Sequence, residues 1–256
     1  MSKLKPIQNN VVQNDPWQAL KKFTAARIAL GRTGAAIPLK ETLQLMQDHA
    51  NARDAVYTSL DIIKLVQQLE SFKLPIFHLQ SKAINRQQYL QRPDLGRQLS
   101  ETSKKQFAAI ESNAACDIAI VIADGLSATS VQNHTVPVLQ QLMPLLKKYN
   151  LMLSVVEQGR VAIADEVGAM LNAKLSLVLI GERPGLSAQD SMSAYFTWHP
   201  KPGLTDESRN CISNIRPQGL GYKDAADKIN YLIQQAFHLN LSGVLLKDDC
   251  NLRAHL

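Results

Sequence analysis

The sequence predicts an α/β fold: a Rossmann-like or flavodoxin-like parallel sheet flanked by helices, with a helical N-terminal region. Two apolar runs, Ile118–Ala123 and Leu175–Ile180, have the composition of parallel strands that are buried on both faces. Segments with helical spacing of apolar residues alternate with such runs, which is typical of parallel sheets with right-handed crossovers. We therefore expect a helical region over residues 1–110 and an α/β domain over residues 111–256.

The first hundred residues show helical spacing of their apolar residues. Such spacing marks Trp17–Leu30, Leu39–Ala50 and Val56–Leu69, and Pro75 interrupts the last of these series. Pro93 indicates a bend before a further helix. No alternation of apolar and polar residues typical of a strand is evident, so helices alone are expected here.

The character of the chain changes near Cys116, where strands and helices begin to alternate. We expect strands at Ile118–Ala123, Leu151–Val156, Leu175–Ile180 and Val244–Leu246. The expected helices are Val131–Tyr149, with irregularities at Pro137 and Pro144, Ala162–Leu171 and Asp224–Leu239.

The bulk composition argues against several classes of protein. The chain has 256 residues, of which 45% are hydrophobic and 20% are charged, as is usual for a globular protein with its own core. No apolar run approaches the roughly 18 residues that span a bilayer, and no apolar stretch follows Lys3 and Lys5 as in a secretory signal. The net charge of +6 is spread over separate lysine pairs rather than gathered into a stripe. We therefore expect neither a membrane nor a nucleic acid as a partner.

The three cysteines are Cys116, Cys211 and Cys250, whose odd number and spacing argue against a disulfide framework and a zinc site. Free thiols fit a reducing cytoplasm. Cys211 lies in the polar segment Asp206–Pro217, and His199 is only loosely near it as a candidate base. Packing of Cys211 against a ligand is favoured over a nucleophilic role, although a lone cysteine is most often a small core residue.

Residues suited to ligand binding follow two of the predicted strands. Leu175–Ile180 runs into Gly181-Glu182-Arg183-Pro184-Gly185, and Ile118–Ala123 ends in Asp124-Gly125. Ligands of open α/β sheets bind outside the carboxyl ends of the strands. The carboxylate of Glu182 is a candidate acceptor for ligand amides or hydroxyls, and a local ion pair or a solvated loop is the alternative.

A further candidate is Gly159-Arg160-Val161, which lies between a predicted strand and the helix that begins near Ala162. Backbone N–H groups at the start of a helix bind polar ligand groups. The chain has no Gly-x-Gly-x-x-Gly and no Gly-Lys-Ser/Thr string, so neither a dinucleotide fingerprint nor a phosphate-binding loop is expected. An ordinary turn is the equal alternative.

Asp124, Ser127 and His134 could form the Asp/Ser/His set of an α/β hydrolase. A nucleophile elbow would require Gly-x-Ser-x-Gly, and the residues around Ser127 do not match it. Ser127 is instead expected to cap the following helix. His134, about two turns into that helix, is expected to have a structural or hydrogen-bonding role.

Six strings of residues occur in an order that is specific when they are taken together. They are Ala26–Arg32, His49–Val56, Tyr89–Arg97, Ala123–Ala128, Leu179–Leu186 and Arg209–Pro217. With them the chain resembles the small (light) subunit of ethanolamine ammonia-lyase, from about Asp15 to about Leu246.

This resemblance implies an adenosylcobalamin-dependent lyase that converts ethanolamine to acetaldehyde and ammonia. The substrate would lie mainly in a large subunit, a β/α barrel, and the cobalamin at the junction of the two subunits. Carried over from the family, the cobalamin contacts are Val161, Glu182 and Cys211. No catalytic residue and no cobalt ligand is expected from this chain, which lacks the Asp-x-His-x-x-Gly string of proteins that replace the lower base of cobalamin.

The resemblance also implies a hetero-oligomer with six copies of each subunit, in the cytoplasm and within a bacterial microcompartment. The segment before Asp15 is shorter than the lead that often targets family members to that compartment. Two alternatives are a structural or assembly subunit that does not contact the cofactor, and a stand-alone α/β hydrolase.

Overall fold

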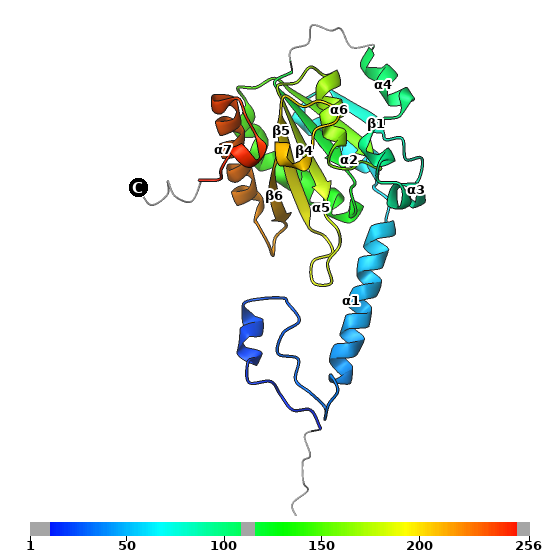
Figure 1. Ribbon diagram of the computed structural model, residues 1–256, viewed down its shortest axis with the longest axis vertical. Helices are drawn as coiled ribbons and strands as arrows, with labels where there is room; N and C mark the ends of the chain where they lie inside the picture. The colour runs from blue at the N-terminus through cyan, green and yellow to red at the C-terminus, as the bar shows by residue number, and fades with distance from the viewer. Residues whose placement is uncertain (1–10, 109–115, 250–256) are drawn as a thin grey trace, which may run out of the picture. The chain divides into compact units, whose positions relative to one another are not determined.

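A six-stranded sheet forms the centre of the larger of two units in this chain (Figure 1). The computed structural model describes residues 11–108 and 116–249. The chain divides into residues 1–54 with 185–188 and residues 55–184 with 189–256. The strands, in the spatial order β1-β3-β2-β4-β5-β6, are β1 Ile76–Gln80, β3 Leu151–Glu157, β2 Ile118–Ala123, β4 Leu175–Gly181, β5 Met192–Trp198 and β6 Arg209–Ile215.

The predicted α/β class is confirmed, and so are strands β2, β3 and β4. The sheet is mixed and not parallel throughout, because β5 pairs antiparallel with both β4 and β6. A parallel pair requires a crossover of about a dozen or more residues, and the loops on either side of β5 are shorter than that. The finer Rossmann-like or flavodoxin-like description stays a prediction.

Two further expectations about strands are corrected. The segment over residues 1–110 is not all helical, because β1 lies inside it and pairs parallel with β3. The segment Val244–Leu246 is not a strand, because its residues lie in and just after the 3-10 turn Gly243–Leu245. The Asn210 side chain accepts a hydrogen bond from the Gly243 N–H at 2.6 Å, which holds this segment in a turn at the side of β6.

Helices cover both faces of the sheet. Every residue of β2 and β4 is buried, as expected of strands that are covered on both sides. The isoleucines of β2 join one apolar cluster with helices α5 (Ala128–Leu142) and α7 (Tyr222–Leu239), and its Ala119, Val121 and Ala123 join a second cluster with α6 (Ile163–Met170). The larger unit also contains α2 Ile62–Leu69, α3 Arg86–Gln91 and α4 Glu101–Ala108.

Helix α5 begins as the sequence predicts. The Ser127 hydroxyl accepts a hydrogen bond from the Ser130 N–H at 3.3 Å and donates one to the Gln189 carbonyl at 3.0 Å. Pro137 lies inside the helix, and Pro144 lies in the 3-10 turn Met143–Leu146 that follows it. The predicted cap and the irregularity at Pro144 are confirmed, whereas the irregularity expected at Pro137 is absent, because α5 continues as an α-helix through that residue.

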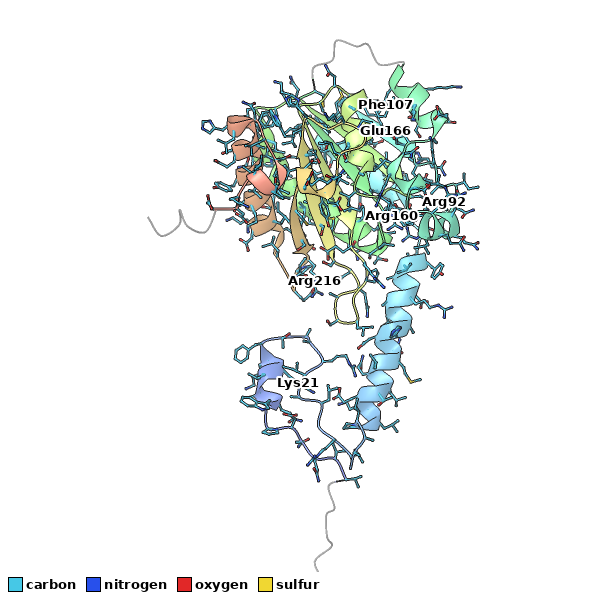
Figure 2. All side chains as sticks on the ribbon, viewed as in Figure 1. Lys21, Arg92, Phe107, Arg160, Glu166 and Arg216 are labelled. Carbon is cyan, nitrogen blue, oxygen red and sulfur yellow. The ribbon has the colours of Figure 1, made fainter. Side chains whose placement is uncertain are left out.

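The smaller unit consists of the 3-10 turn Gln18–Lys22, irregular chain and most of helix α1 (Leu39–Tyr57). The helical spacing over Trp17–Leu30 therefore produces only one short turn. Among residues 11–54, only Pro38 is buried. Polar contacts tie the turn and the loop to α1, for example Lys21 Nζ to Glu41 Oε1 at 3.5 Å. Figure 2 labels Lys21 in this turn.

In the described residues, no helix combines the length and the apolar character that a membrane crossing would need. Cys116 is buried and Cys211 is exposed, both as free thiols, and Cys250 lies outside the described residues.

Replacing Ser127 with alanine should lower the free energy of unfolding by about 1 kcal/mol, because the first turn of α5 loses its side-chain cap. Denaturant unfolding of the wild-type and variant chains measures this loss. Ser71→Ala is the matched control, because that hydroxyl bonds only an exposed carbonyl. Equal stability of the Ser127 variant and the wild type would contradict the assigned cap.

Candidate ligand-binding site

The connections of the central strands create a candidate ligand-binding edge. Strand β2 has β3 on one side and β4 on the other. The chain leaves β2 through α5 on one face of the sheet and leaves β3 through α6 on the other face. In open α/β sheets, ligands bind outside the carboxyl ends of the strands where such a reversal occurs.

Two glycines allow the carboxyl ends of β2 and β4 to approach each other closely. Gly125 has a φ of +58°, and the Leu126 N–H donates to the Gly181 carbonyl at 3.0 Å. A Cβ atom on Gly125 would lie 2.2 Å from the Gly181 oxygen, and one on Gly181 would lie 2.1 Å from the Ser127 oxygen. No side chain fits at either position, so the two strand ends have a fixed separation.

Asp124 ties this edge to the loop after β3. Its carboxyl group is buried, and Oδ1 accepts a hydrogen bond from the Gly159 N–H at 3.0 Å. Arg86 Nη1 lies 3.7 Å from Asp124 Oδ2 and donates to the Gly125 carbonyl at 2.7 Å. Burial raises the pKa of Asp124 to about 6, although Arg86 and the backbone hydrogen bonds act in the opposite direction.

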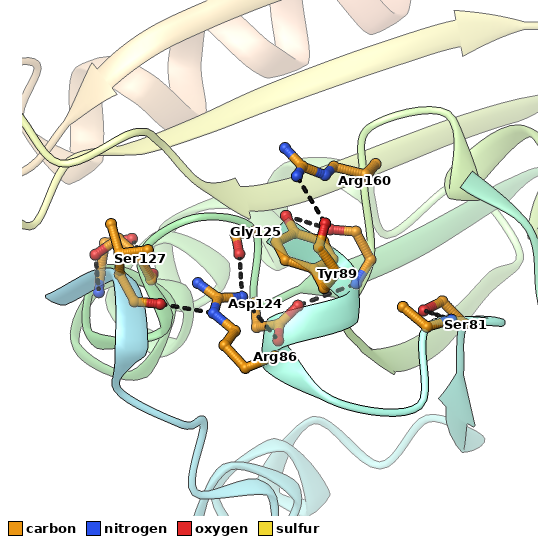
Figure 3. Close-up of polar contacts among 11 residues, drawn as sticks. Ser81, Arg86, Tyr89, Asp124, Gly125, Ser127 and Arg160 are labelled. Atoms are coloured by element: carbon orange, nitrogen blue, oxygen red, sulfur yellow. Dashed lines mark hydrogen bonds and ion pairs between the residues drawn. The ribbon is translucent and has the colours of Figure 1, made fainter. Parts of the chain in front are cut away.

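Tyr89 of α3 lies between two guanidinium groups. Arg160 and Arg86 are 4.1 Å and 4.7 Å from its ring centroid, within the range of cation–π contacts. Its hydroxyl donates to the Gly159 carbonyl at 3.3 Å, and Arg160 Nη2 donates to the Tyr89 carbonyl at 3.0 Å (Figure 3). Burial raises the pKa of the Tyr89 hydroxyl above its ordinary value, so the group stays a neutral donor.

Val161 and Glu182, two of the residues predicted to bind a ligand, line the same cavity of about 190 Å³. Val161 lies in the turn just before α6, and Glu182 directly follows β4. Glu182 Oε1 accepts hydrogen bonds from the Ser193 hydroxyl and, at 2.9 Å, from the Asn214 N–H. Both bonds reach Oε1 and hold the carboxylate in place, and none of the hydrogen bonds found among the described residues reaches Oε2.

Cys211, the third predicted residue, is not among the residues that line this cavity. It is on β6 directly opposite Tyr195 of β5, and Tyr195 lines the cavity. Desolvation raises the pKa of the Cys211 thiol above its ordinary value, against a hydrogen bond with Tyr195 that lowers it. A raised pKa disfavours a thiolate, which argues against a nucleophilic role for this residue.

Sequence reasoning did not identify Arg86 and Tyr89 as parts of the site. Both lie on α3, a helix of six residues whose mostly polar sequence is typical of a solvent-exposed helix. Their importance comes from contacts with Asp124 and Arg160, which are distant in sequence. Arg160 was noticed only as a residue next to a glycine, and no local pattern connects it to Tyr89.

The residues of the hydrolase interpretation have other partners. The Ser127 hydroxyl is occupied by the cap of α5 and by the Gln189 carbonyl. His134 is buried and its Nδ1 lies 2.9 Å from the Tyr222 hydroxyl. Since Asp124 is held by Arg86 and the Gly159 N–H, the three side chains do not form a catalytic set.

Comparison with known proteins relates this chain to one family. The family model "Ethanolamine ammonia-lyase light chain (EutC)" matches residues 14–247. The chain is 48% identical over 245 residues to the ethanolamine ammonia-lyase small subunit of Pseudomonas aeruginosa (strain LESB58), covering 94% of this chain and 90% of the relative. Similar relatives with the same name occur in Ralstonia nicotianae (48% over 242 residues; 93% and 90% covered) and Pseudomonas putida strain W619 (49% over 240 residues; 92% and 88% covered).

Replacing Gly125 with alanine should lower the free energy of unfolding by about 1–3 kcal/mol or more, because a Cβ atom cannot fit 2.2 Å from the Gly181 oxygen. Gly203→Ala is the matched control, since Gly203 also has a positive φ, +93°, but no heavy atom lies within 4 Å of its Cβ position. Urea unfolding of both variants distinguishes the loss of stability caused by the close contact from the loss caused by backbone strain. An equal loss in the two variants would contradict the role assigned to the contact between the strand ends.

The buried Asp124 should make stability fall as pH rises from about 4 to about 6. The folded state keeps the proton up to about pH 6, while the unfolded chain releases it near the ordinary value of 3.8, so unfolding becomes easier across this window. A difference of about 2 between the pKa of Asp124 in the folded and in the unfolded chain corresponds to about 3 kcal/mol of unfolding free energy, lost in full once the pH is above the folded pKa. Asp124→Asn should remove this part of the pH dependence, measured by urea unfolding at each pH.

Asp117→Asn provides a control of opposite sign. Burial alone would raise the pKa of Asp117, but the Asn150 N–H and Lys174 hold it below its ordinary value. Asp117 therefore contributes stability above its unfolded pKa that is lost as pH falls. The Asp124 assignment fails if both substitutions change the pH profile in the same direction.

Proposed function

Because this chain belongs to the ethanolamine ammonia-lyase light chain family, we propose that it is the small subunit of an adenosylcobalamin-dependent ethanolamine ammonia-lyase. Such an enzyme converts ethanolamine to acetaldehyde and ammonia. The chain would contribute part of the cobalamin site, and the large subunit would hold the substrate and most of the reacting groups. The observation that carries this proposal is the single cavity between the ends of β2 and β4 that Val161 and Glu182 both line.

The groups at this cavity suit the rim of a corrin ring. A corrin carries amide side chains, which donate and accept hydrogen bonds. Glu182 offers a carboxylate oriented by Ser193 and Asn214, and Val161 offers an apolar surface beside backbone N–H groups at the start of α6. The exposed Cys211 thiol extends this surface beyond Tyr195.

The size of the cavity supports a shared site. Pockets that enclose drug-sized ligands measure roughly 300–1,000 Å³, whereas this one measures about 190 Å³. It is suited to one edge of a macrocycle, and a partner subunit would cover the rest. This division agrees with the name "small subunit" carried by the relatives.

When bound, adenosylcobalamin supplies the radical chemistry through homolysis of its cobalt–carbon bond, and protein supplies binding and orientation. Glu182 would orient the corrin rim through its free carboxylate oxygen. Tyr89, Arg86 and Asp124 would keep the loops after β2 and β3 in place. Val161 and Tyr195 would keep water away from the edge of the ring. Cobalt would receive no ligand from this chain.

The partner proposed for this chain is the large subunit of the same enzyme, in an assembly with six copies of each. We place that assembly in the cytoplasm, within a bacterial microcompartment. A purely structural subunit is the remaining alternative, and it would not change cofactor affinity. The hydrolase alternative lacks support because its three residues are engaged elsewhere.

Glu182→Gln should weaken adenosylcobalamin binding by the complex with the large subunit by about tenfold to a hundredfold, because a charged hydrogen bond becomes a neutral one. An ultraviolet–visible titration of the reconstituted complex measures the dissociation constant. Glu70→Gln, in the 3-10 turn Glu70–Phe72, is the control that removes one exposed carboxylate.

Unchanged affinity in the Glu182 variant would remove Glu182 from the site. The same titration with the large subunit alone distinguishes the proposed function from the alternative of a purely structural subunit. If the large subunit binds the cofactor equally well without this chain, the proposed role in the cobalamin site is wrong.

A further inference from the structure

The turn after β6 lies at the same edge of the sheet as the proposed site. Strand β5 is antiparallel to both β4 and β6, so β4 and β6 run in the same direction and end at one edge. Arg216 is the first residue after β6 (Figure 2). It is not among the residues that line the cavity of Glu182, so any effect of Arg216 on a ligand there has to pass through other residues.

The backbone of Asn214 orients Glu182 from an uncommon conformation. Asn214 has a φ of +59°, in the left-handed region, which is uncommon for residues other than glycine. In this conformation its N–H donates to Glu182 Oε1 at 2.9 Å. Its side-chain Oδ1 accepts a hydrogen bond from Arg216 Nε at 3.0 Å, and its carbonyl accepts one from the Leu220 N–H at 2.8 Å. Arg216 therefore helps to hold the turn that supplies a hydrogen bond to Glu182.

The guanidinium group of Arg216 has an acidic neighbour of its own. Nη1 lies 3.8 Å from Asp190 Oδ1, and only 14% of the Arg216 side chain is exposed. Asp190 Oδ2 lies 3.5 Å from His134 Nε2, which is buried and makes no hydrogen bond among the described residues. The other ring nitrogen of His134 lies 2.9 Å from the Tyr222 hydroxyl. Because this imidazole belongs to α5 and contacts α7, the Asp190 carboxylate has a neighbour with a fixed position.

These contacts connect both ends of one loop. Glu182 begins the segment between β4 and β5, and Asp190 lies near the end of the same segment. The two ends are also joined directly, because the Glu182 N–H donates to the Ser191 carbonyl at 2.9 Å. Arg216 contacts Asp190 at one end of the loop and, through Asn214, supports the hydrogen bond to Glu182 at the other end. The position of the Glu182 carboxylate therefore depends on Arg216 from two directions.

We propose that Arg216 is a positioning residue of the cofactor site, which keeps the Asn214 N–H directed at Glu182, while Asp190 and His134 keep Arg216 in place. This inference rests on the proposed function. A carboxylate that is fixed before the ligand arrives loses less conformational freedom on binding. The contribution of Arg216 is therefore expected in the affinity for the cofactor, and it passes through Glu182.

A double-mutant cycle tests whether Arg216 acts through Glu182. Adenosylcobalamin is titrated into the complex with the large subunit in the absence of ethanolamine, so absorbance reports binding without turnover. Arg216→Ala should weaken binding by about threefold to tenfold when Glu182 is present. In a complex that carries Glu182→Ala, the same substitution should change the affinity by less than about twofold, because no carboxylate remains to be positioned.

Conservative and control variants distinguish positioning from a general loss of stability. Arg216→Lys keeps a cation beside Asp190 and should retain part of the affinity that Arg216→Ala loses. Asp190→Asn changes a side chain that is 39% exposed, should weaken binding in the same direction, and tests the proposal even if Arg216→Ala folds poorly. Lys174→Ala is the matched control, because it breaks an ion pair with Asp117, 2.9 Å apart, at the amino ends of β2 and β4. It should leave the affinity unchanged.

Two outcomes would overturn the proposal. One is an unchanged affinity in both the Arg216→Ala and Asp190→Asn variants. The other is an equal loss from Arg216→Ala with and without the Glu182→Ala substitution. If Glu182→Ala alone weakens binding in either case, the proposed function stands and only the role of Arg216 is wrong. If Glu182→Ala leaves the affinity unchanged as well, the role of Glu182 in the proposed function is also wrong.

Discussion

The site depends on a steric constraint: the backbones at the ends of β2 and β4 meet where there is no room for a side chain. Gly125 and Gly181 lie against each other's loops, and one hydrogen bond, from Leu126 to the Gly181 carbonyl, joins them. Glu182 is the next residue after this contact, and Asp124 is the residue before it. Both carboxylates therefore start from backbone positions that have almost no freedom.

A buried electrostatic network connects this contact between the strand ends to the neighbouring loops and fixes their positions as well. Asp124 in the interior is stabilised by Arg86 and by the Gly159 N–H, and Tyr89 fills the space between Arg86 and Arg160. The network joins α3 to the loops after β2 and β3, three segments that are far apart in sequence. A site that holds only one edge of a large ligand gains affinity from such rigidity, because less order has to be created when the ligand binds.

The parts of the fold that could be predicted are those whose residues all have the same degree of burial. Strands β2 and β4 are buried on both faces, so each is a continuous apolar run. Strand β6 was missed because buried and exposed residues are mixed along Arg209–Ile215. Strand β1 was missed because an edge strand of only five residues after Pro75 shows too short a pattern of apolar residues. Val161 and Glu182 were located by their places beside strand and helix ends, whereas Cys211 came from the family resemblance. The contacts of Arg86 and Tyr89 arise from tertiary packing, which no local pattern contains.

The most direct test of the account is a cryo-electron-microscopy structure of the complex with the large subunit and bound adenosylcobalamin. The account predicts one edge of the corrin ring within contact distance of Val161, Glu182 and Cys211, with the large subunit on the opposite side of the ring. A corrin ring bound away from all three residues would contradict it.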